Sequence, residues 1–412
     1  MQALSSLMES LYGRGADTSA HLERFKKLKR RFEEQYAAVP SAYFSSPGRV
    51  EICGNHTDHN HGKVLVGAIS VDTIAAVSPH PNEVVVLSEG YPEVRFPAGD
   101  TALRSEEYGT SYALVKGVMQ AFKDRGYNVG GFVAVTSSNV FKGAGVSSSA
   151  SFELLVTEIL NKLYNGGAVQ AVERAVISQY AENVYFNKPS GLLDQMGIAL
   201  GGISTIDFAD PKEPLVKSLY LSLNGLCIYI VNTGGDHSNL TPAYAGIKSD
   251  MQLVAAYFGK QYLRDVSENE FYSSLPGLSA AVSGRAVLRA VHFFEENKRV
   301  ERAARAVERA DAPALLAEIN ASGDSSWKLL QNCYVEGDVS QRIPLGLAAA
   351  ARYTEGGAVR VHGGGFAGTV LCFVPEKNAA AFEEGMSEIF GAENIFGISV
   401  REKGACSVDI DI

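Results

Sequence analysis

The sequence has few of the features that mark secreted, membrane-spanning or nucleic-acid-binding proteins. Its 412 residues include five cysteines, an odd number, and no two of them form a CxxC pair. This usage is typical of free thiols in a reducing compartment and argues against a disulfide framework or a zinc site. No run of 18 apolar residues occurs, so we expect no membrane-spanning helix. The first twenty residues lack a basic region followed by a long apolar run, so we expect no signal peptide and a cytoplasmic location.

An excess of basic residues is also missing. The net charge is −9, which argues against nonspecific binding to nucleic acid or to an anionic membrane. It does not exclude an anionic small molecule, because a local cationic site matters more than the total charge. No internal repeat and no low-complexity tract is visible.

What is present is an ordinary globular composition with alternating helix and strand patterns. Hydrophobic residues make up 46% and charged residues 20%, and the length suggests two or three domains. We expect an α+β fold in two halves, residues 1–205 and 206–412, that meet at a cleft. Periodicity predicts strands at 42–52, 64–77, 84–87, 132–136 and 226–232 and helices at 21–36, 111–125, 168–186, 243–263, 279–296, 299–320, 325–334 and 344–353.

Residues 142–150 form a loop rich in glycine and serine before a segment with helical spacing. The loop reads KGAGVSSSA. Glycines let backbone N–H groups approach an anion, the helix dipole attracts it, and a serine hydroxyl can donate to it or ligate Mg²⁺. A turn with N-cap serines is the alternative. The loop matches neither GxxxxGK[ST] nor the dinucleotide-binding glycine pattern.

Polar residues that suit acid–base chemistry or sugar binding occur in two further segments. Residues 47–58 read PGRVEICGNHTD, and short polar side chains supply the donors and acceptors that sugar hydroxyls need. A polar surface turn is the alternative. Asp194, in an apolar stretch, can act as a general base or can cap a helix after Gly191. Glu182, on a predicted helix, can reach a metal or can lie on a solvated face.

Four segments follow one another along the chain: PGRVEICGNHTDHNHGKVLVGAIS, GAGVSSSAS, SGLLDQMG and VHGGGFAGTVLCFV. The first resembles the galactokinase signature GRVNLIGEHTDYNGG, and the second resembles the phosphate loop of the GHMP kinase superfamily. The third is similar to the galactokinase segment CGIMDQ, and the fourth to the third GHMP motif, GGGFGG. The resemblance implies a two-domain GHMP kinase fold with the active site in the cleft between the domains. It also implies an ATP-dependent sugar 1-kinase that converts galactose and ATP to galactose 1-phosphate and ADP.

The resemblance further implies a role for each matching residue. Asp194 would take the proton from the C1 hydroxyl or orient that hydroxyl, and Arg49 would stabilise negative charge and keep Asp194 ionised. Ser149 and Glu182 would hold Mg²⁺ on the phosphates of ATP. The expected ATP-binding residues are Gly143, Ala144, Gly145, Val146, Ser147, Ser148 and Ser149. The expected sugar-binding residues are Asn55, His56, Thr57, Asp58 and Tyr244. Gly363 to Gly365 would form a close-packed turn nearby. A small-molecule sugar and ATP would be the partners of a monomeric protein.

The sequence departs from the family pattern at sugar-facing positions. Asn55 replaces a glutamate that contacts the C6 end of the sugar in relatives, and His59 replaces a tyrosine. Replacing a carboxylate with an amide removes one negative charge and adds two donors. A sugar modified at C6, such as galacturonate, or another relative such as N-acetylgalactosamine, is therefore an alternative acceptor.

Two other functions fit the same fold. A non-catalytic sugar sensor would bind sugar and ATP and regulate a partner, but the chain keeps Ser149, Ala150 and Asp194. A kinase for mevalonate, homoserine or a related alcohol is the second; the HTD triplet and the LLDQ segment argue against it.

Overall fold

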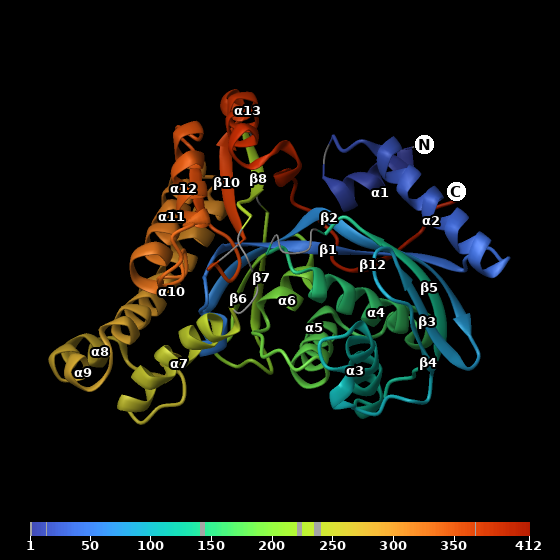
Figure 1. Ribbon diagram of the computed structural model, residues 1–412, viewed down its shortest axis with the longest axis horizontal. Coiled ribbons are helices and arrows are strands. Elements are labelled where there is room, and N and C mark those ends of the chain that lie inside the picture. Colours follow the sequence, from blue (N-terminus) through green and yellow to red (C-terminus); the bar gives the residue numbers. More distant parts are fainter. Residues whose placement is uncertain (1, 14, 141–144, 221–224, 235–239, 367) are drawn as a thin grey trace.

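The computed structural model describes residues 2–13, 15–140, 145–220, 225–234, 240–366 and 368–412. This part of the chain forms an eight-stranded sheet and a four-stranded sheet with helices packed on both, which confirms the α+β class. In Figure 1 the larger sheet lies across the centre and right, and the helices of the second half lie on the left. None of the described helices is long and apolar enough to cross a membrane. All five cysteines are free thiols.

The larger sheet joins strands from the first half of the chain to one strand from its end. Its order is β12-β1-β2-β5-β3-β4, and β6 pairs with β2 and β7. β3 runs parallel to β5, and the other pairs are antiparallel. The strands are β1 (Ala42–Cys53), β2 (Lys63–His80), β3 (Glu83–Ser88), β4 (Val94–Pro97), β5 (Gly131–Ser138), β6 (Ile203–Asp207), β7 (Leu215–Leu219) and β12 (Cys406–Val408).

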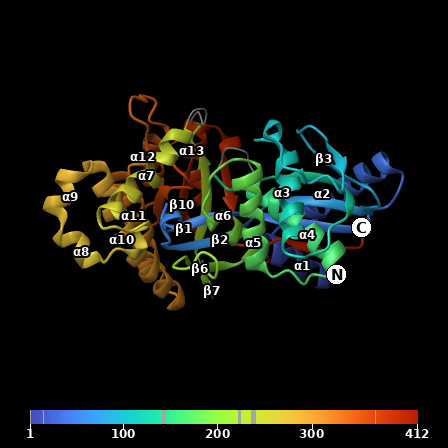
Figure 2. The same cartoon turned by 90° about the horizontal axis from the view of Figure 1, so that it is seen from below.

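Helices cover both faces of this sheet, which explains the continuous apolar runs of its strands. Val84 and Val86 of β3 belong to the core under α3, α4 and α5, whereas Val85 belongs to the core under α1 and α2. Successive strand residues point to opposite faces, so a strand covered on both sides needs apolar residues throughout. Figures 1 and 2 show these two layers. The helices are α1 (Gln2–Tyr12), α2 (Thr18–Tyr36), α3 (Ser111–Asp124), α4 (Ser148–Asn165), α5 (Ala171–Tyr180) and α6 (Leu193–Leu200).

The smaller sheet carries the helices of the second half. Its antiparallel order is β11-β8-β10-β9. One core joins the two sheets: it contains Val50 and Ile52 of β1, Ile228 of β8 and Val300 of α10. The elements are β8 (Leu226–Asn232), β9 (Ala358–Val361), β10 (Thr369–Pro375), β11 (Ile395–Ile398), α7 (Thr241–Tyr257), α8 (Glu268–Ser273), α9 (Leu275–Ala281), α10 (Gly284–Glu308), α11 (Ala312–Ser325), α12 (Arg342–Tyr353) and α13 (Ala379–Phe390).

Short helical turns connect several of these elements. Two π-helical turns extend α5 and α11 at Ala181–Tyr185 and Ser326–Leu330. The 3₁₀ turns are Asp58–Asn60, Ser105–Glu107, Leu263–Asp265, Glu376–Asn378 and Ala392–Asn394.

Three predicted helices differ from the structure in their division or type, and the helix predicted at 243–263 ends earlier, at Tyr257. The helices predicted at 279–296 and 299–320 are wrong in their division, because α10 runs without a break from Gly284 to Glu308 and α11 begins at Ala312. The helix predicted at 325–334 is only the π-helical turn after α11, and it ends where Gln331 takes a left-handed conformation with φ 60°. The division at residue 205 stays a prediction. β6 spans that residue, and β6, β7 and β12 all pair within the larger sheet.

Candidate active site

An arginine–aspartate pair lies at the centre of the candidate site. Arg49 stands on β1 beyond the register shift at Pro47 and Gly48, and Asp194 stands in the first turn of α6. The Arg49 Nε donates to Asp194 Oδ1 over 2.7 Å, and Nη2 lies 2.5 Å from the same oxygen. Asp194 is therefore not the N-cap that its position after Gly191 allowed; Leu192 occupies that position.

The phosphate loop contacts this pair directly. The Ser147 hydroxyl donates to Asp194 Oδ2, and Arg49 donates to the carbonyl of Gly145. Gly145 and Ser147 have positive φ values of 65° and 63°, and the Ser147 side chain makes no capping bond to α4. The loop is thus not a simple N-cap turn. Gly143 and Ala144 lie outside the described residues.

The environment of Asp194 keeps its carboxylate ionised. Burial alone would raise the pKa, but the Arg49 charge and the hydrogen bond from Ser147 outweigh it and lower the pKa below its usual value. Asp194 is therefore an anion that is held in place by two donors and accepts further hydrogen bonds across the physiological pH range.

A second carboxyl, that of Asp58, lies beside it in the opposite electrostatic situation. Burial and the nearby Asp194 charge raise the pKa of Asp58 to about 6. Its Oδ2 accepts a hydrogen bond from the backbone N–H of Leu193 over 3.4 Å. This approach requires Gly191, because a Cβ atom there would lie 1.7 Å from the same oxygen.

Glu182 forms the third part of the site. It lies in the π-helical turn after α5 and is 2% exposed, so it is not a solvated helix-face residue. Oε1 accepts from the Ser149 hydroxyl over 3.0 Å and from Lys188 Nζ over 2.7 Å. Oε2 accepts from the Ser190 hydroxyl over 2.7 Å and from the Gln195 amide over 2.9 Å. Ser190 and Gln195 thus fix Oε2, whereas Oε1 faces the phosphate loop.

This donor set suits a magnesium ion that is shared with a nucleotide. Within the described part of the chain no three or more His, Cys, Asp or Glu side chains gather in a metal-binding cluster. Mg²⁺ commonly binds one or two protein oxygens and completes its shell with phosphate oxygens and water, which Ser149 and Glu182 Oε1 allow. Behind them, Glu153 Oε1 and Gln195 Oε1 are buried without a hydrogen-bond partner.

Two of the five predicted sugar-binding residues are turned into the protein. Asn55 is fully buried; its amide nitrogen donates to Gly363 O over 2.8 Å, and its oxygen accepts from Asn332 over 2.8 Å. The Thr57 hydroxyl is buried 2.7 Å from the Lys63 carbonyl oxygen. The structure therefore does not support a direct sugar contact by Asn55 or Thr57; both fix the shape of the loop.

His56 and Tyr244 meet at the glycine turn of the fourth motif. His56 Nε2 donates to Gly364 O over 2.9 Å, and the Tyr244 hydroxyl donates to Gly365 O over 3.0 Å. A Cβ atom at Gly364 would lie 2.4 Å from the Tyr244 ring, which confirms the close-packed turn expected at Gly363 to Gly365. Ala367, which stands where the third GHMP motif has a glycine, lies outside the described residues.

Two histidines lie in contact beside this turn: His56, which the family signature shares, and His59, which replaces the family tyrosine. His56 Nδ1 lies 3.3 Å from His59 Nε2, and His59 Nδ1 lies 3.0 Å from the Asn60 amide nitrogen. Because the Gly364 oxygen can only accept, His56 carries its proton on Nε2 and accepts from His59 on Nδ1. Burial lowers the pKa of both rings, that of His59 well below its usual value, so the pair is neutral.

The sequence did not reveal a buried ion pair that anchors β1, just before residues 54–61, to the smaller sheet. Arg360 Nη2 on β9 lies 3.0 Å from Glu51 Oε1 on β1, and Nη1 donates to Ile52 O over 2.7 Å. The sequence analysis also did not predict the ion pair between Lys188 and Glu182. For Lys188 a signal existed, since it lies six residues from both Glu182 and Asp194. For Glu51 and Arg360, 309 residues apart, no local pattern connects the two.

Similarity to known proteins agrees with this geometry. The family described as GHMP kinases N terminal domain matches residues 113–202, which include the phosphate loop, Glu182 and Asp194. The chain is thus a kinase of the GHMP superfamily. A second family, described as the galactokinase galactose-binding signature, matches residues 30–79.

Relatives along nearly the full length give the narrower assignment. Human galactokinase is 31% identical over 395 residues, 93% of this chain and 96% of that protein. Galactokinase of Streptomyces coelicolor is 29% identical over 373 residues, 89% of this chain and 92% of that protein. The chain belongs to the galactokinase family.

The fold comparison is consistent with that family. Lactococcus lactis galactokinase in complex with galactose matches with a TM-score of 0.79 at 24% identity and covers 94% of this chain and 100% of that one. Methanococcus jannaschii mevalonate kinase matches at 0.62 and 13% identity, covering 87% and 98%. The GHMP kinase fold is confirmed, and the sequence relatives favour galactokinase over mevalonate kinase.

Proposed function

We propose that this protein transfers the γ-phosphate of ATP to the C1 hydroxyl of galactose and releases galactose 1-phosphate and ADP. The observation that carries the proposal is the Asp194 carboxylate, held by Arg49 and by Ser147 of the phosphate loop. An acceptor hydroxyl bound at Asp194 would lie next to the loop that binds the phosphate donor. The galactokinase relatives supply the sugar.

In the proposed reaction, the C1 oxygen attacks the γ-phosphorus and the bond from that phosphorus to the β–γ bridging oxygen breaks. The hydroxyl proton passes to Asp194. Because the pKa of Asp194 is lowered, it is a weak base, which favours orientation of the hydroxyl first and proton transfer late. Arg49 stabilises negative charge as it develops.

Residues 143–149 would bind the triphosphate, and Ser149 and Glu182 would hold Mg²⁺. When bound, the ion would neutralise phosphate charge. His56, Asp58 and Tyr244 remain proposed sugar contacts, because they lie around the glycine turn and Asp194. We further propose a monomeric enzyme in the cytoplasm.

The alternative of a C6-modified acceptor loses its original basis. It depended on Asn55 facing the C6 group, and the Asn55 amide is bonded inside the protein. The sensor alternative would need a site unfit for transfer, whereas Arg49, Asp194, Ser149 and Glu182 lie in one connected arrangement.

The proposal is tested with purified protein, Mg²⁺-ATP and a panel of galactose, galacturonate, N-acetylgalactosamine, arabinose and fucose. We expect galactose to have the highest kcat/KM. Asp194→Asn should lower kcat at least about 100-fold, the usual worth of a positioned acid–base group, while ATP still binds in calorimetry. Asp324→Asn, at an ion pair whose partners are both 68% exposed, is the matched control and should keep full activity. Better turnover of another panel sugar, or an active Asp194→Asn, would overturn the assignment.

A further inference from the structure

Lys188 is a cation of the active site that the family motifs do not account for. It lies in the loop between the π-helical turn that carries Glu182 and helix α6 that carries Asp194. Its ammonium is 2.7 Å from Glu182 Oε1. That charge also reaches Asp194, where it adds to the effects of Arg49 and Ser147 that lower the pKa against burial.

The two oxygens of Glu182 have different partners. Oε2 is held by Ser190 and Gln195, which belong to the protein frame. Oε1 is shared by Ser149 and Lys188. Lys188 therefore pairs with the oxygen that faces Ser149, the other residue suited to hold Mg²⁺. An ammonium and a metal ion compete for one carboxylate oxygen, so the lysine would lose this partner in the loaded enzyme.

The loop fixes the backbone of Lys188 and leaves its side chain free to change partner. The Lys188 N–H donates to Glu182 O over 3.1 Å, and Asn183 Oδ1 accepts from Ser190 N over 2.7 Å. The Lys188 side chain is nevertheless 55% exposed, whereas Glu182 is 2% exposed. A lysine has a flexible four-carbon stem, so the ammonium can swing while the backbone stays anchored.

We propose that Lys188 exchanges partners during the reaction: it rests on Glu182 Oε1 in the free enzyme and moves onto the γ-phosphate of bound ATP. An ammonium there donates to an oxygen whose charge changes during transfer, which is how cationic side chains promote phosphoryl transfer. The inference builds on the kinase function proposed above. It adds a residue to the phosphate site, and it predicts that this residue opposes metal binding before ATP arrives.

Nucleotide binding without sugar separates this role from a structural one. Lys188→Met should raise the dissociation constant of Mg²⁺-ATP about tenfold, near the lower end of what a charged hydrogen bond contributes. The dissociation constant of Mg²⁺-ADP should not rise, because ADP has no γ-phosphate and its metal ion no longer competes with the lysine for Glu182 Oε1. Isothermal titration calorimetry measures both. Equal weakening of ATP and ADP, or weakening of neither, overturns the proposal.

Lys188→Met should weaken ATP binding but should lower the Mg²⁺ concentration that turnover requires. Because Lys188 competes for Glu182 Oε1, Lys188→Met should lower the Mg²⁺ concentration for half-maximal activity by at least about twofold, since surface ion pairs already contribute up to about 1 kcal/mol and Glu182 is buried. The kcat should fall, and Lys188→Arg should recover part of it because it keeps the charge. An unchanged or higher Mg²⁺ requirement in Lys188→Met contradicts the exchange.

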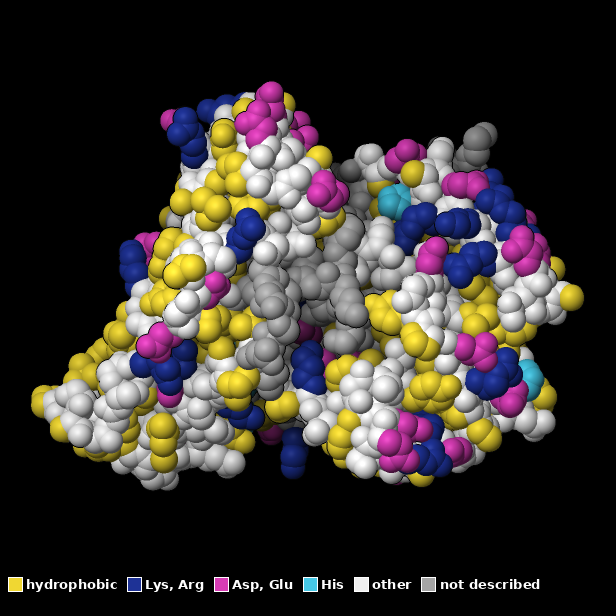
Figure 3. Space-filling model, in the orientation of Figure 1, with side chains coloured by type: hydrophobic (Ala, Val, Ile, Leu, Met, Phe, Trp, Pro, Cys, Tyr) yellow, Lys and Arg dark blue, Asp and Glu magenta, His cyan; other side chains and the backbone are white. Residues whose placement is uncertain are grey.

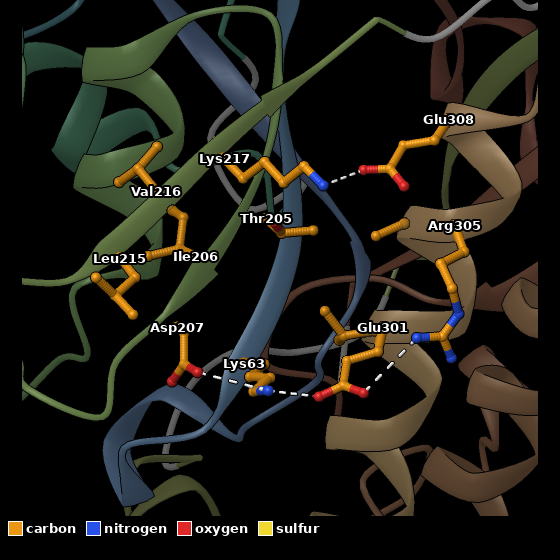
Figure 4. Close-up of a pocket in the computed structure, with 12 residues that line it drawn as sticks. Lys63, Thr205, Ile206, Asp207, Leu215, Val216, Lys217, Glu301, Arg305 and Glu308 are labelled. Carbon is orange, nitrogen blue, oxygen red and sulfur yellow. Dashed lines mark hydrogen bonds and ion pairs between the residues drawn. The ribbon is translucent and has the colours of Figure 1, made fainter.

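Lys217 provides a matched control. Figure 4 shows Lys217 of β7 paired with Glu308 of α10, in a separate cavity of about 300 Å³ between the β6–β7 ribbon and α10. Lys217 is 66% exposed, similar to Lys188, and Lys217→Met should change neither nucleotide affinity nor Mg²⁺ dependence. A wild-type protein that binds ATP but phosphorylates no sugar overturns the proposed function. A fully active kinase in which Lys188→Met binds ATP normally overturns only the role of Lys188.

Discussion

The surroundings of two neighbouring carboxyl groups, Asp58 and Asp194, shift their pKa values in opposite directions. Asp194 has the guanidinium of Arg49 and the hydroxyl of Ser147, and its pKa falls despite burial. Asp58 is buried and faces the Asp194 charge, and these two effects outweigh its backbone hydrogen bonds and raise its pKa to about 6. Two carboxyls whose pKa values are separated in this way are typical of acid–base sites. We therefore expect the protonation of Asp58 to cause the loss of activity on the acidic side of the pH–rate profile.

The pH dependence of the reaction should reveal Asp58. As an ion it accepts hydrogen bonds from sugar hydroxyls at both oxygens, and protonation below about pH 6 turns one of these oxygens into a donor and removes the charge that strengthens the bonds. We expect kcat/KM for the sugar to fall about tenfold per pH unit below that point. Asp58→Asn should remove the inflection and leave a lower, flat profile. An inflection near pH 6 that persists in Asp58→Asn would assign it to another group.

Stability gives an independent check on Asp58. The folded pKa is raised, so the contribution of Asp58 to stability is full below the ordinary pKa of 3.8 and is lost as the pH rises through about 6. Asp58→Asn should therefore raise the melting temperature relative to wild type at pH 8 and not at pH 4. Thermal unfolding at the two pH values measures the difference.

At the scale of elements, the short loop before α6 brings the site together. Gly191 lets Asp58 approach the N-terminus of α6, and the loop also carries Lys188 and Ser190 onto Glu182. Because the chain runs from Glu182 to Asp194 in twelve residues, one connection positions both the metal-side and the acceptor-side carboxylates.

A methyl group at Gly191 should damage sugar binding without unfolding the protein. Its Cβ would lie 1.7 Å from Asp58 Oδ2, so Asp58 must shift away from the Leu193 N–H. We expect Gly191→Ala to raise KM for the sugar at least about tenfold, the effect of losing one charged hydrogen bond. Steady-state kinetics with varied sugar measures it.

Gly99→Ala is the matched substitution for that experiment. Gly99 lies in a loop with no positive φ, and a Cβ atom there would have nothing within 4 Å. It should leave KM unchanged. An unaltered KM in Gly191→Ala would show that Asp58 does not depend on this close approach.

The sequence identified those parts of the site that are local in the chain. The phosphate loop, Asp194 and Glu182 each lie in a short segment with a recognisable pattern, so their elements were predictable. The orientation of Asn55 was not, because its partners Gly363 and Asn332 lie in the second half of the chain. The continuous helix α10 was not predicted either. Periodicity suggested a break near residue 297, although no glycine or proline lies there to end a helix.

Over the whole molecule, charged groups on the larger sheet and around it are paired rather than gathered by sign. Figure 3 shows acidic and basic side chains near one another on the upper left and the right of the visible face, and few charged side chains on the lower left. Other charged groups are buried, in a cluster around Asp72 on β2. This cluster joins parts of the chain that are far apart in sequence. Its carboxylate accepts hydrogen bonds from Tyr12 of α1 over 2.8 Å, from Arg24 of α2 over 2.7 Å and from Ser45 of β1 over 2.5 Å. Arg401 donates to it over 3.5 Å.

Asp72 therefore ties both ends of the chain to the sheet that carries the site. Asp72 and Arg401 are fully buried, so Asp72→Asn would leave buried arginine charge without its partner. Breaking such a pair costs about 3–5 kcal/mol, whereas Asp324→Asn at the exposed pair with Lys328 should cost about 1 kcal/mol or less. Urea unfolding compares the two variants with wild type.

The pH dependence decides whether charge is the cause. Burial raises the pKa of Asp72, but Arg24 and Arg401 outweigh it, and the folded pKa lies below the ordinary 3.8. Its stabilisation is then present above that value and is lost as the pH falls through the folded pKa. The stability gap between wild type and Asp72→Asn should thus be full at pH 7 and narrow as the pH falls below about 4. A gap that stays constant with pH would mean that Asp72 acts through shape and hydrogen bonds, and that the two ends are held to the sheet without the ion pairs.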